Sequence, residues 1–225
     1  MVFGFSGAFL NSFVSGEVIR VALNDESSKT VGLFVSWTAF VAAIVSLIFG
    51  KYTHDYGKGP VMIFGNFMFL GVALPFILFP DLKSWTWYSL LLVYACQGIG
   101  RATFESTMKA VFADMFPYEK EGAFANIILQ DGLSGSIGYL LTFQLVCSDL
   151  GPYCVEYRNG TLHDVLSFEI LVCVTAVAAV VGYIRASQLY WKERTGTEAN
   201  ALKDYRVGSI RAYRQSRSSI VNNSS

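Results

Sequence analysis

Long apolar stretches alternate with short polar segments along most of this chain. A hydrocarbon core of about 30 Å needs roughly 20 helical residues to cross it, and each of these stretches reaches that length. The sequence therefore predicts an all-α membrane protein, with a six-helix transmembrane domain over residues 1–190. The six predicted spans are Val2–Leu23, Val31–Gly50, Val61–Phe79, Trp85–Val111, Ala123–Cys147 and Leu166–Leu189.

The first of these spans is unusual in containing several glycines and polar residues, among them Asn11, Glu17 and Arg20. Small and weakly polar side chains are typical of a membrane helix that packs against other helices. We therefore expect this span to lie inside the helix bundle rather than against lipid.

Composition agrees with a protein whose main partner is the lipid bilayer. Hydrophobic residues make up 53% of the chain and charged residues only 15%, whereas soluble domains carry about a quarter charged residues. The 17 basic and 17 acidic residues give a net charge of zero, which argues against nucleic acid as a partner.

The segment after the last span is polar and basic. Residues 191–225 lose the apolar periodicity and end in a stretch rich in serine and asparagine, so we expect a disordered tail. Positive charge concentrates on the cytoplasmic side of membrane proteins, which predicts a multi-pass protein of the plasma membrane or an endomembrane with a cytoplasmic C-terminus. Serines among the arginines are candidates for phosphorylation; the alternative is a solvated basic tail near anionic lipid.

On this orientation the loop before the last span faces outward. Asn159 begins a glycosylation sequon in that loop. Cys147 and Cys154 lie near its start and are a possible disulfide pair in an oxidising compartment, although they would close a short loop.

The loop between the second and third spans reads Gly-Lys-Tyr-Thr-His-Asp-Tyr-Gly-Lys from Gly50 to Lys58. It resembles the signature loop G-x-x-x-D-x-x-G-[RK] of the major facilitator superfamily, with Gly50, Gly57 and Lys58 at matching positions. Asp55 comes one position later than the family's acidic residue, because His54 occupies that place. The resemblance implies a tight turn at the glycines and a basic residue that meets a neighbouring helix end.

Residues Gly98–Phe112 and Glu121–Asn126 resemble the C-terminal half of UNC-93-like proteins, a divergent branch of the same superfamily. The likeness implies a twelve-span fold of two six-helix halves around a central cavity, of which this chain provides spans seven to twelve. We therefore expect a fragment, a truncated gene product, or a half that dimerises. Its partner would be the missing N-terminal half or a second copy.

Eight charged residues lie within the predicted spans, and four of them are candidates for a functional site. Glu169 is not one of these, because it lies near the outward end of the last span, where we expect it to be hydrated. Arg101, Glu105 and Lys109 recur every four residues and share one helix face, and Asp131 lies about ten residues into the next span. Charges at membrane depth are tolerated when they are paired or face a polar cavity. One hypothesis is that these residues line a solute or ion pathway; the alternative is a buried ion pair that holds two helices together.

Function follows from the resemblance more than from any catalytic motif. His54 and His163 lie on opposite sides of the predicted membrane, and no G-x-S-x-G, Walker or H-E-x-x-H motif occurs, so we expect no enzyme, no metal and no cofactor. The resemblance implies a transmembrane transporter of the major facilitator type. It leaves open a non-transporting regulator of an ion channel, or a trafficking chaperone for a membrane receptor, which would bind another membrane protein.

Overall fold

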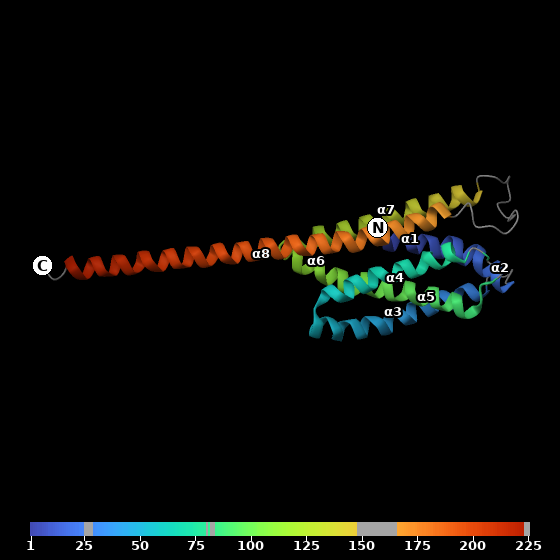
Figure 1. Ribbon diagram of the computed structural model, residues 1–225, viewed down its shortest axis with the longest axis horizontal. Coiled ribbons are helices and arrows are strands. Elements are labelled where there is room, and N and C mark those ends of the chain that lie inside the picture. Colours follow the sequence, from blue (N-terminus) through green and yellow to red (C-terminus); the bar gives the residue numbers. More distant parts are fainter. Residues whose placement is uncertain (25–28, 80, 82–83, 148–165, 223–225) are drawn as a thin grey trace. The chain divides into compact units, whose positions relative to one another are not determined.

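The computed structural model describes residues 1–24, 29–79, 81, 84–147 and 166–222, with their side chains except at 143–147 and 198–222. These ranges are almost wholly helical and contain no strand (Figure 1). In chain order the helices are α1 (Val2–Ala8), η1 (Phe9–Val18), α2 (Ile19–Leu23), α3 (Lys29–Tyr56), α4 (Lys58–Leu78), α5 (Trp87–Ala102), η3 (Thr103–Met108), α6 (Lys109–Met115), α7 (Lys120–Cys147) and α8 (Leu166–Asn222).

Each predicted span corresponds to one continuous helical run. Helices α1, η1 and α2 form the first run, and α5, η3 and α6 form the fourth. The middle segments η1 and η3 are wound as π-helix, a form that is rare and frequent at functional sites.

Four of these helices are long and apolar enough to cross a membrane: Val2–Leu23, Lys29–Tyr56, Lys58–Leu78 and Leu166–Thr197. The fourth run and α7 are more polar, because they contain the four candidate charged residues and several glycines.

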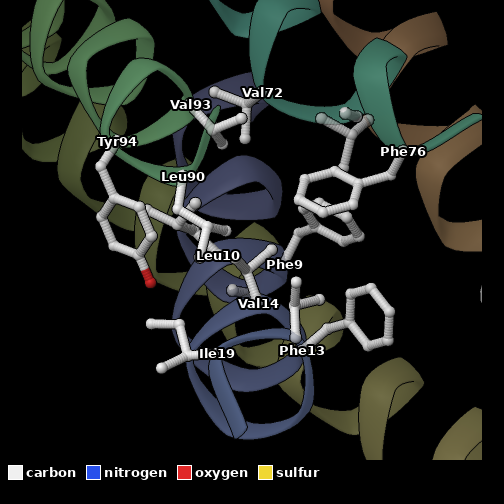
Figure 2. Close-up of a cluster of buried hydrophobic side chains, with 14 of the residues drawn as sticks. Phe9, Leu10, Phe13, Val14, Ile19, Val72, Phe76, Leu90, Val93 and Tyr94 are labelled. Atoms are coloured by element: carbon white, nitrogen blue, oxygen red, sulfur yellow. The ribbon is translucent and has the colours of Figure 1, made fainter. Parts of the chain in front are cut away.

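The first run lies inside the bundle, as its small and polar residues predicted. Its buried side chains, including Phe9, Phe13 and Val14, pack against Phe76 of α4 and Tyr94 of α5 in one apolar cluster (Figure 2). The rings of Phe9 and Phe76 meet edge to face with centroids 5.6 Å apart, a favoured aromatic geometry. This run is therefore the central element of residues Met1–Tyr183.

Hydrogen bonds between helices supplement the apolar contacts. The hydroxyls of Ser15 and Tyr94 lie 2.7 Å apart and join η1 to α5. Thr38 Oγ1 donates to the Tyr94 carbonyl oxygen at 3.2 Å, and Trp37 Nε1 donates to the Leu91 carbonyl oxygen at 3.1 Å, which joins α3 to α5. Such bonds contribute on the order of 1 kcal/mol each between membrane helices.

Large apolar side chains cover the outside of the bundle. They are exposed along α3, α4, α7 and the first part of α8, as expected for surfaces in contact with lipid. They include Leu33, Phe40, Leu47, Phe67, Leu78, Ile128, Leu140, Ile170 and Val181.

Helix α8 continues beyond the point at which the sequence predicts disorder. The chain divides into two compact units, Met1–Tyr183 and Ile184–Ser225, and α8 is one helix through Asn222. No proline interrupts residues 166–222, and alanine, leucine, lysine, arginine and glutamate, all good helix formers, recur beyond Trp191. The expected tail after residue 190 is thus helical, and the unit boundary lies several residues earlier than the predicted domain boundary.

Candidate functional site

An ion pair lies at the centre of the fourth helical run. Arg101 is fourteen residues from either end of Trp87–Met115. Its Nε donates to Glu105 Oε1 at 2.9 Å, the one-turn pairing that the spacing predicted. Both side chains remain partly accessible, with exposed fractions of 42% and 45%. The face that bears this pair is therefore open at mid-helix in this chain.

Asp131 of α7 belongs to the same group of charges. Its carboxylate interacts electrostatically with the amino group of Met1 first, and then with Glu105 and Lys109, where α6 and α7 pack together. Its Oδ1 is buried and has no hydrogen-bond partner among the described residues. The structure thus brings together the four charged residues selected from sequence. Arg101 comes from α5, Glu105 from η3, Lys109 from α6 and Asp131 from α7.

Polar contacts also join η1 to α7. Asn11 Nδ2 lies 3.4 Å from the hydroxyl oxygen of Tyr139, and Ser12 Oγ donates to Thr142 Oγ1 at 3.1 Å. Sequence reasoning noted that the first span is polar but did not identify these partners. Such a contact has a sequence signal: each helix has a hydroxyl-bearing residue one turn from a small residue. Here these are Ser12 after Ala8 and Thr142 after Gly138.

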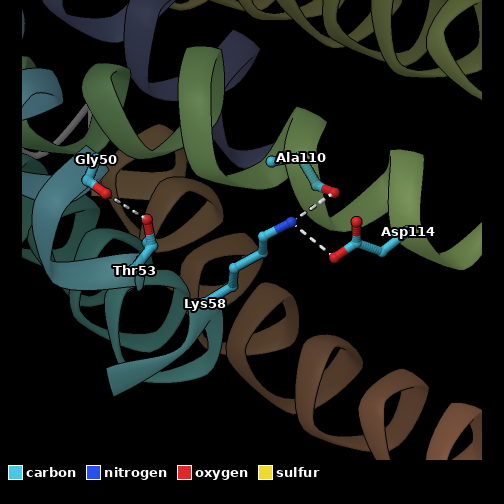
Figure 3. A network of polar contacts seen from close by, with 5 residues as sticks. All are labelled: Gly50, Thr53, Lys58, Ala110 and Asp114. Atoms are coloured by element: carbon cyan, nitrogen blue, oxygen red, sulfur yellow. Dashed lines mark hydrogen bonds and ion pairs between the residues drawn. The ribbon is translucent and has the colours of Figure 1, made fainter. Parts of the chain in front are cut away.

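The loop between α3 and α4 also forms a compact polar arrangement. Gly57 has φ +83°, a conformation that side chains rarely adopt, so the chain turns there without strain. Lys58 Nζ then reaches across to α6 and bonds to Asp114 Oδ2 at 2.6 Å and to the Ala110 carbonyl oxygen at 3.2 Å (Figure 3). The basic residue does meet the end of a neighbouring helix, as the signature loop implies.

Other residues of this loop contribute less. Asp55 is largely exposed and pairs with its neighbour His54 at 3.3 Å, while a Cβ on Gly50 would meet nothing within 4 Å. Sequence reasoning singled out Asp55 and missed Asp114, the acid that Lys58 binds. Asp114 lies in the last turn of α6, at the end of the predicted span that follows α4, and Lys58 lies at the start of α4. The two residues are therefore on the same predicted side of the membrane, and this was the available signal.

Comparison with known proteins decides the family. A model of the Major Facilitator Superfamily matches residues 1–217, which is nearly the whole chain. The chain belongs to the Major Facilitator Superfamily. No curated protein and no solved structure matches it. Together with the four apolar helices, this membership establishes an all-α membrane protein of the facilitator type.

The Lys58–Asp114 bridge has a structural role that can be tested. Lys58 and Asp114 side chains are 33% and 59% exposed, so the pair is screened and we expect it to contribute only about 0.5 kcal/mol to stability. Asp114→Asn should lower the thermal unfolding temperature of the purified protein slightly, and Lys58→Asp with Asp114→Lys should restore it. If the double replacement is no better than either single one, the bridge does not hold α4 to α6.

Glu169 of this superfamily member departs from the sequence interpretation, which placed it near the outward interface in contact with water. Its side chain is 1% exposed, and Oε1 has no hydrogen-bond partner among the described residues. Neighbouring Phe168 inserts between Phe9 and Gly138, and this packing draws the start of α8 into the bundle. Glu169 is therefore a buried carboxyl group rather than a hydrated one.

Removing the ionisable group at this position should stabilise the protein. Burial of a charge without a partner costs several kcal/mol, and a neutral side chain of equal size avoids that cost. We expect Glu169→Gln to raise the thermal unfolding temperature by a few degrees, while Glu169→Ala lowers it by leaving a cavity. A fall with glutamine comparable to that with alanine would mean that the carboxylate has an essential partner.

The remaining predicted sites lie elsewhere. Asn159 and Cys154 fall outside the described residues, as does the side chain of Cys147. Cys96 and Cys173 are free thiols. Within the described ranges, no three His, Cys, Asp or Glu residues gather in a way that could hold a metal ion.

Proposed function

We propose that this superfamily member is an UNC-93-like protein that moves a small solute or ion across the membrane. The group formed by Arg101, Glu105, Lys109 and Asp131 would line the pathway. Resemblance of Gly98–Phe112 and Glu121–Asn126 to UNC-93-like sequences supports this branch of the superfamily.

The exposure of the Arg101–Glu105 pair is the observation on which the proposal depends. Each charge at the centre of a membrane helix costs about 2.5–3.5 kcal/mol on insertion scales unless it meets protein or water. A pair that is more than two-fifths exposed at mid-helix would carry this full insertion cost if lipid covered it. A water-filled pathway next to this face removes the penalty and gives the charges a solute to bind.

A second six-helix half completes such a pathway. Helix α3 presents small residues at intervals of three, four or seven along one exposed side: Gly32, Ser36, Ala39, Ala43 and Gly50. A Cβ on Gly32 or Gly50 would meet nothing in this chain, so packing within the chain does not explain these glycines. Small residues permit close approach of another membrane helix, from an N-terminal half or from a second copy.

The basic residues from Arg185 onward support a cytoplasmic C-terminus, since eight of the chain's 17 lysines and arginines fall there. With six spans, the Lys58–Asp114 bridge would then lie on the cytoplasmic side as well.

The rival function keeps the fold and changes what meets the charged face. In a regulator of an ion channel or a receptor chaperone, a transmembrane helix of the partner would bind Arg101 and Glu105 through its own polar residue. The buried Asp131 Oδ1, which has no hydrogen-bond partner among the described residues, favours a pathway, because a carboxylate oxygen without a hydrogen bond in one state is available to a solute or proton in another.

Asp131→Asn tests the two functions against each other. A pathway predicts loss of solute-dependent uptake or current with normal surface expression. A partner-binding role predicts loss of a co-purified membrane protein and no flux in either form. Glu121→Gln, at an exposed position in the first turn of the same helix, is the matched control and should change neither. If Asp131→Asn only prevents stable expression, the residue holds helices together and both functional roles fail.

A further inference from the structure

Helix α8 extends well past the part that crosses the membrane. The predicted apolar span within it ends at Leu189, whereas the helix continues to Asn222. About nine further turns, at 3.6 residues per turn, thus follow the span. These turns have no apolar face broad enough for burial in a bundle, so their conformation needs another partner.

Charge in this part of the chain is strongly biased. Ile184–Ser225 contains eight lysines and arginines but only three acidic residues, Glu193, Glu198 and Asp204. The net charge of this segment is therefore +5, and most of it lies directly after a membrane span. An anionic surface close to the bilayer is the partner that fits this charge.

The helical register collects the positive charge on one side. Lys203, Arg206, Arg214 and Arg217 are separated by three, eight and three positions. At about 100° per residue they fall within an arc of about 80°. All three acidic residues lie outside that arc. We call these four positions the basic face.

An apolar stripe borders the basic face. Leu202, Tyr213 and Ile220 fall within about 20° of one another on the same helix, next to the position of Arg206. A basic face beside a narrow apolar stripe is typical of helices that lie in the membrane interface.

The junction between span and basic face is suited to a bend. Thr195 Oγ1 donates to the Trp191 carbonyl oxygen at 2.8 Å, and Thr197 Oγ1 donates to the Glu193 carbonyl oxygen at 3.0 Å. Threonines that bond back in this way often bend helices. Gly196, between these threonines, has a low helix propensity, and a Cβ added to it would meet nothing within 4 Å.

Aromatic and basic residues mark the interface just before this junction. The Arg194 guanidinium lies 5.6 Å from the centre of the Trp191 ring, and tryptophans and arginines of this kind anchor helices at headgroup depth. A bend at Gly196 would therefore begin where the helix leaves the hydrocarbon.

We propose that residues 198–222 of α8 bind anionic phospholipid headgroups of the bilayer that holds the spans. The basic face contacts the headgroups and the apolar stripe enters the interface. In the cell this rests on the C-terminal orientation proposed above, because the anionic leaflet is the cytoplasmic one. In a symmetric reconstituted bilayer the binding is independent of that orientation and of any transport activity.

The test uses the full chain in nanodiscs of phosphatidylcholine alone or of phosphatidylcholine with phosphatidylserine. An environment-sensitive fluorescent amino acid at Ser209 reports whether this helix lies in the interface. We expect a blue shift with phosphatidylserine that high salt reverses. Arg206→Gln with Arg214→Gln should reduce the ratio of bound to free helix about 25-fold, at about fivefold for each charge near the surface.

The matched control removes the same charge from another side of the helix. Arg211→Gln lowers the net charge by the same amount as Arg206→Gln but leaves the basic face intact, so most of the shift should remain in Arg211→Gln, whereas Arg206→Gln should reduce the ratio of bound to free helix about fivefold. Equal loss in these two single variants would overturn the assignment to one face. The absence of any difference between the two lipid compositions would overturn lipid binding altogether.

Discussion

Replacing Arg101 with glutamine is expected to abolish most solute-dependent flux while leaving the protein folded. The side chain is partly exposed at mid-helix and its ion pair with Glu105 is local to one helix, so its loss costs little stability. A hydrogen bond from the guanidinium to a charged group contributes about 1.5–3 kcal/mol. Its removal should therefore reduce uptake into proteoliposomes about 10- to 100-fold, for whichever solute of a screened panel the wild type transports.

Two further variants separate a pathway role from a structural one. Arg101→Lys keeps the charge but not the forked geometry and should retain partial flux. Exchange of the charges, Arg101→Glu with Glu105→Arg, preserves the intrahelical pair but moves the guanidinium by one turn, so a pathway role predicts that flux stays low. Full flux in the exchanged protein would show that the pair matters only as a pair, and would contradict the proposed pathway.

The helices could be predicted from the sequence because membrane spans have the strongest pattern a chain can show. Every predicted span corresponds to a helical run, and Val2–Leu23 coincides with α1, η1 and α2 to the residue. The difference at α8 has a simple cause. Loss of the continuous apolar pattern after Trp191 indicates that the membrane span has ended, but it does not end a helix that contains no proline.

The candidate site was predicted unevenly, since charge spacing within a helix is readable and pairing between helices is not. Four-residue spacing gave the Arg101–Glu105 pair. Asp114 was missed because its partner Lys58 is 56 residues away, and only tertiary packing brings them together. Glu169 was misread for a related reason: position near a span end suggests hydration, but the burial of Phe168 against Phe9 decides where that turn lies.

The π-helical segments were also beyond the sequence. Glu105 lies in η3, one turn after Arg101 in α5, and no residue preference separates π from α winding in such a short stretch. Their position beside the charged group and along the central first run agrees with the tendency of π segments to occur at functional sites.

Close packing of α1 on α7 leads to the largest expected effect on stability. A Cβ added to Gly4 would lie 2.6 Å from the Asp131 carbonyl oxygen and 2.7 Å from the Gly135 nitrogen. Both are backbone atoms and cannot rotate away, so the two helices would have to separate. We expect Gly4→Val to destabilise the protein by about 3 kcal/mol, at the upper end for overpacked sites, measured by thermal unfolding in detergent.

Gly16→Val is the control, because it makes the same substitution in the same helical run where a Cβ meets nothing within 4 Å; its effect should stay within about 1 kcal/mol, the cost of helix preference. Ser134→Ala provides a second check. Its hydroxyl is a further atom that crowds Gly4, but removing it leaves the backbone contacts in place and should not rescue Gly4→Val. Rescue by Ser134→Ala would mean that the helices touch through side chains alone. The half-buried Asp131, whose position depends on this backbone contact, would then be held less firmly than the proposed pathway requires.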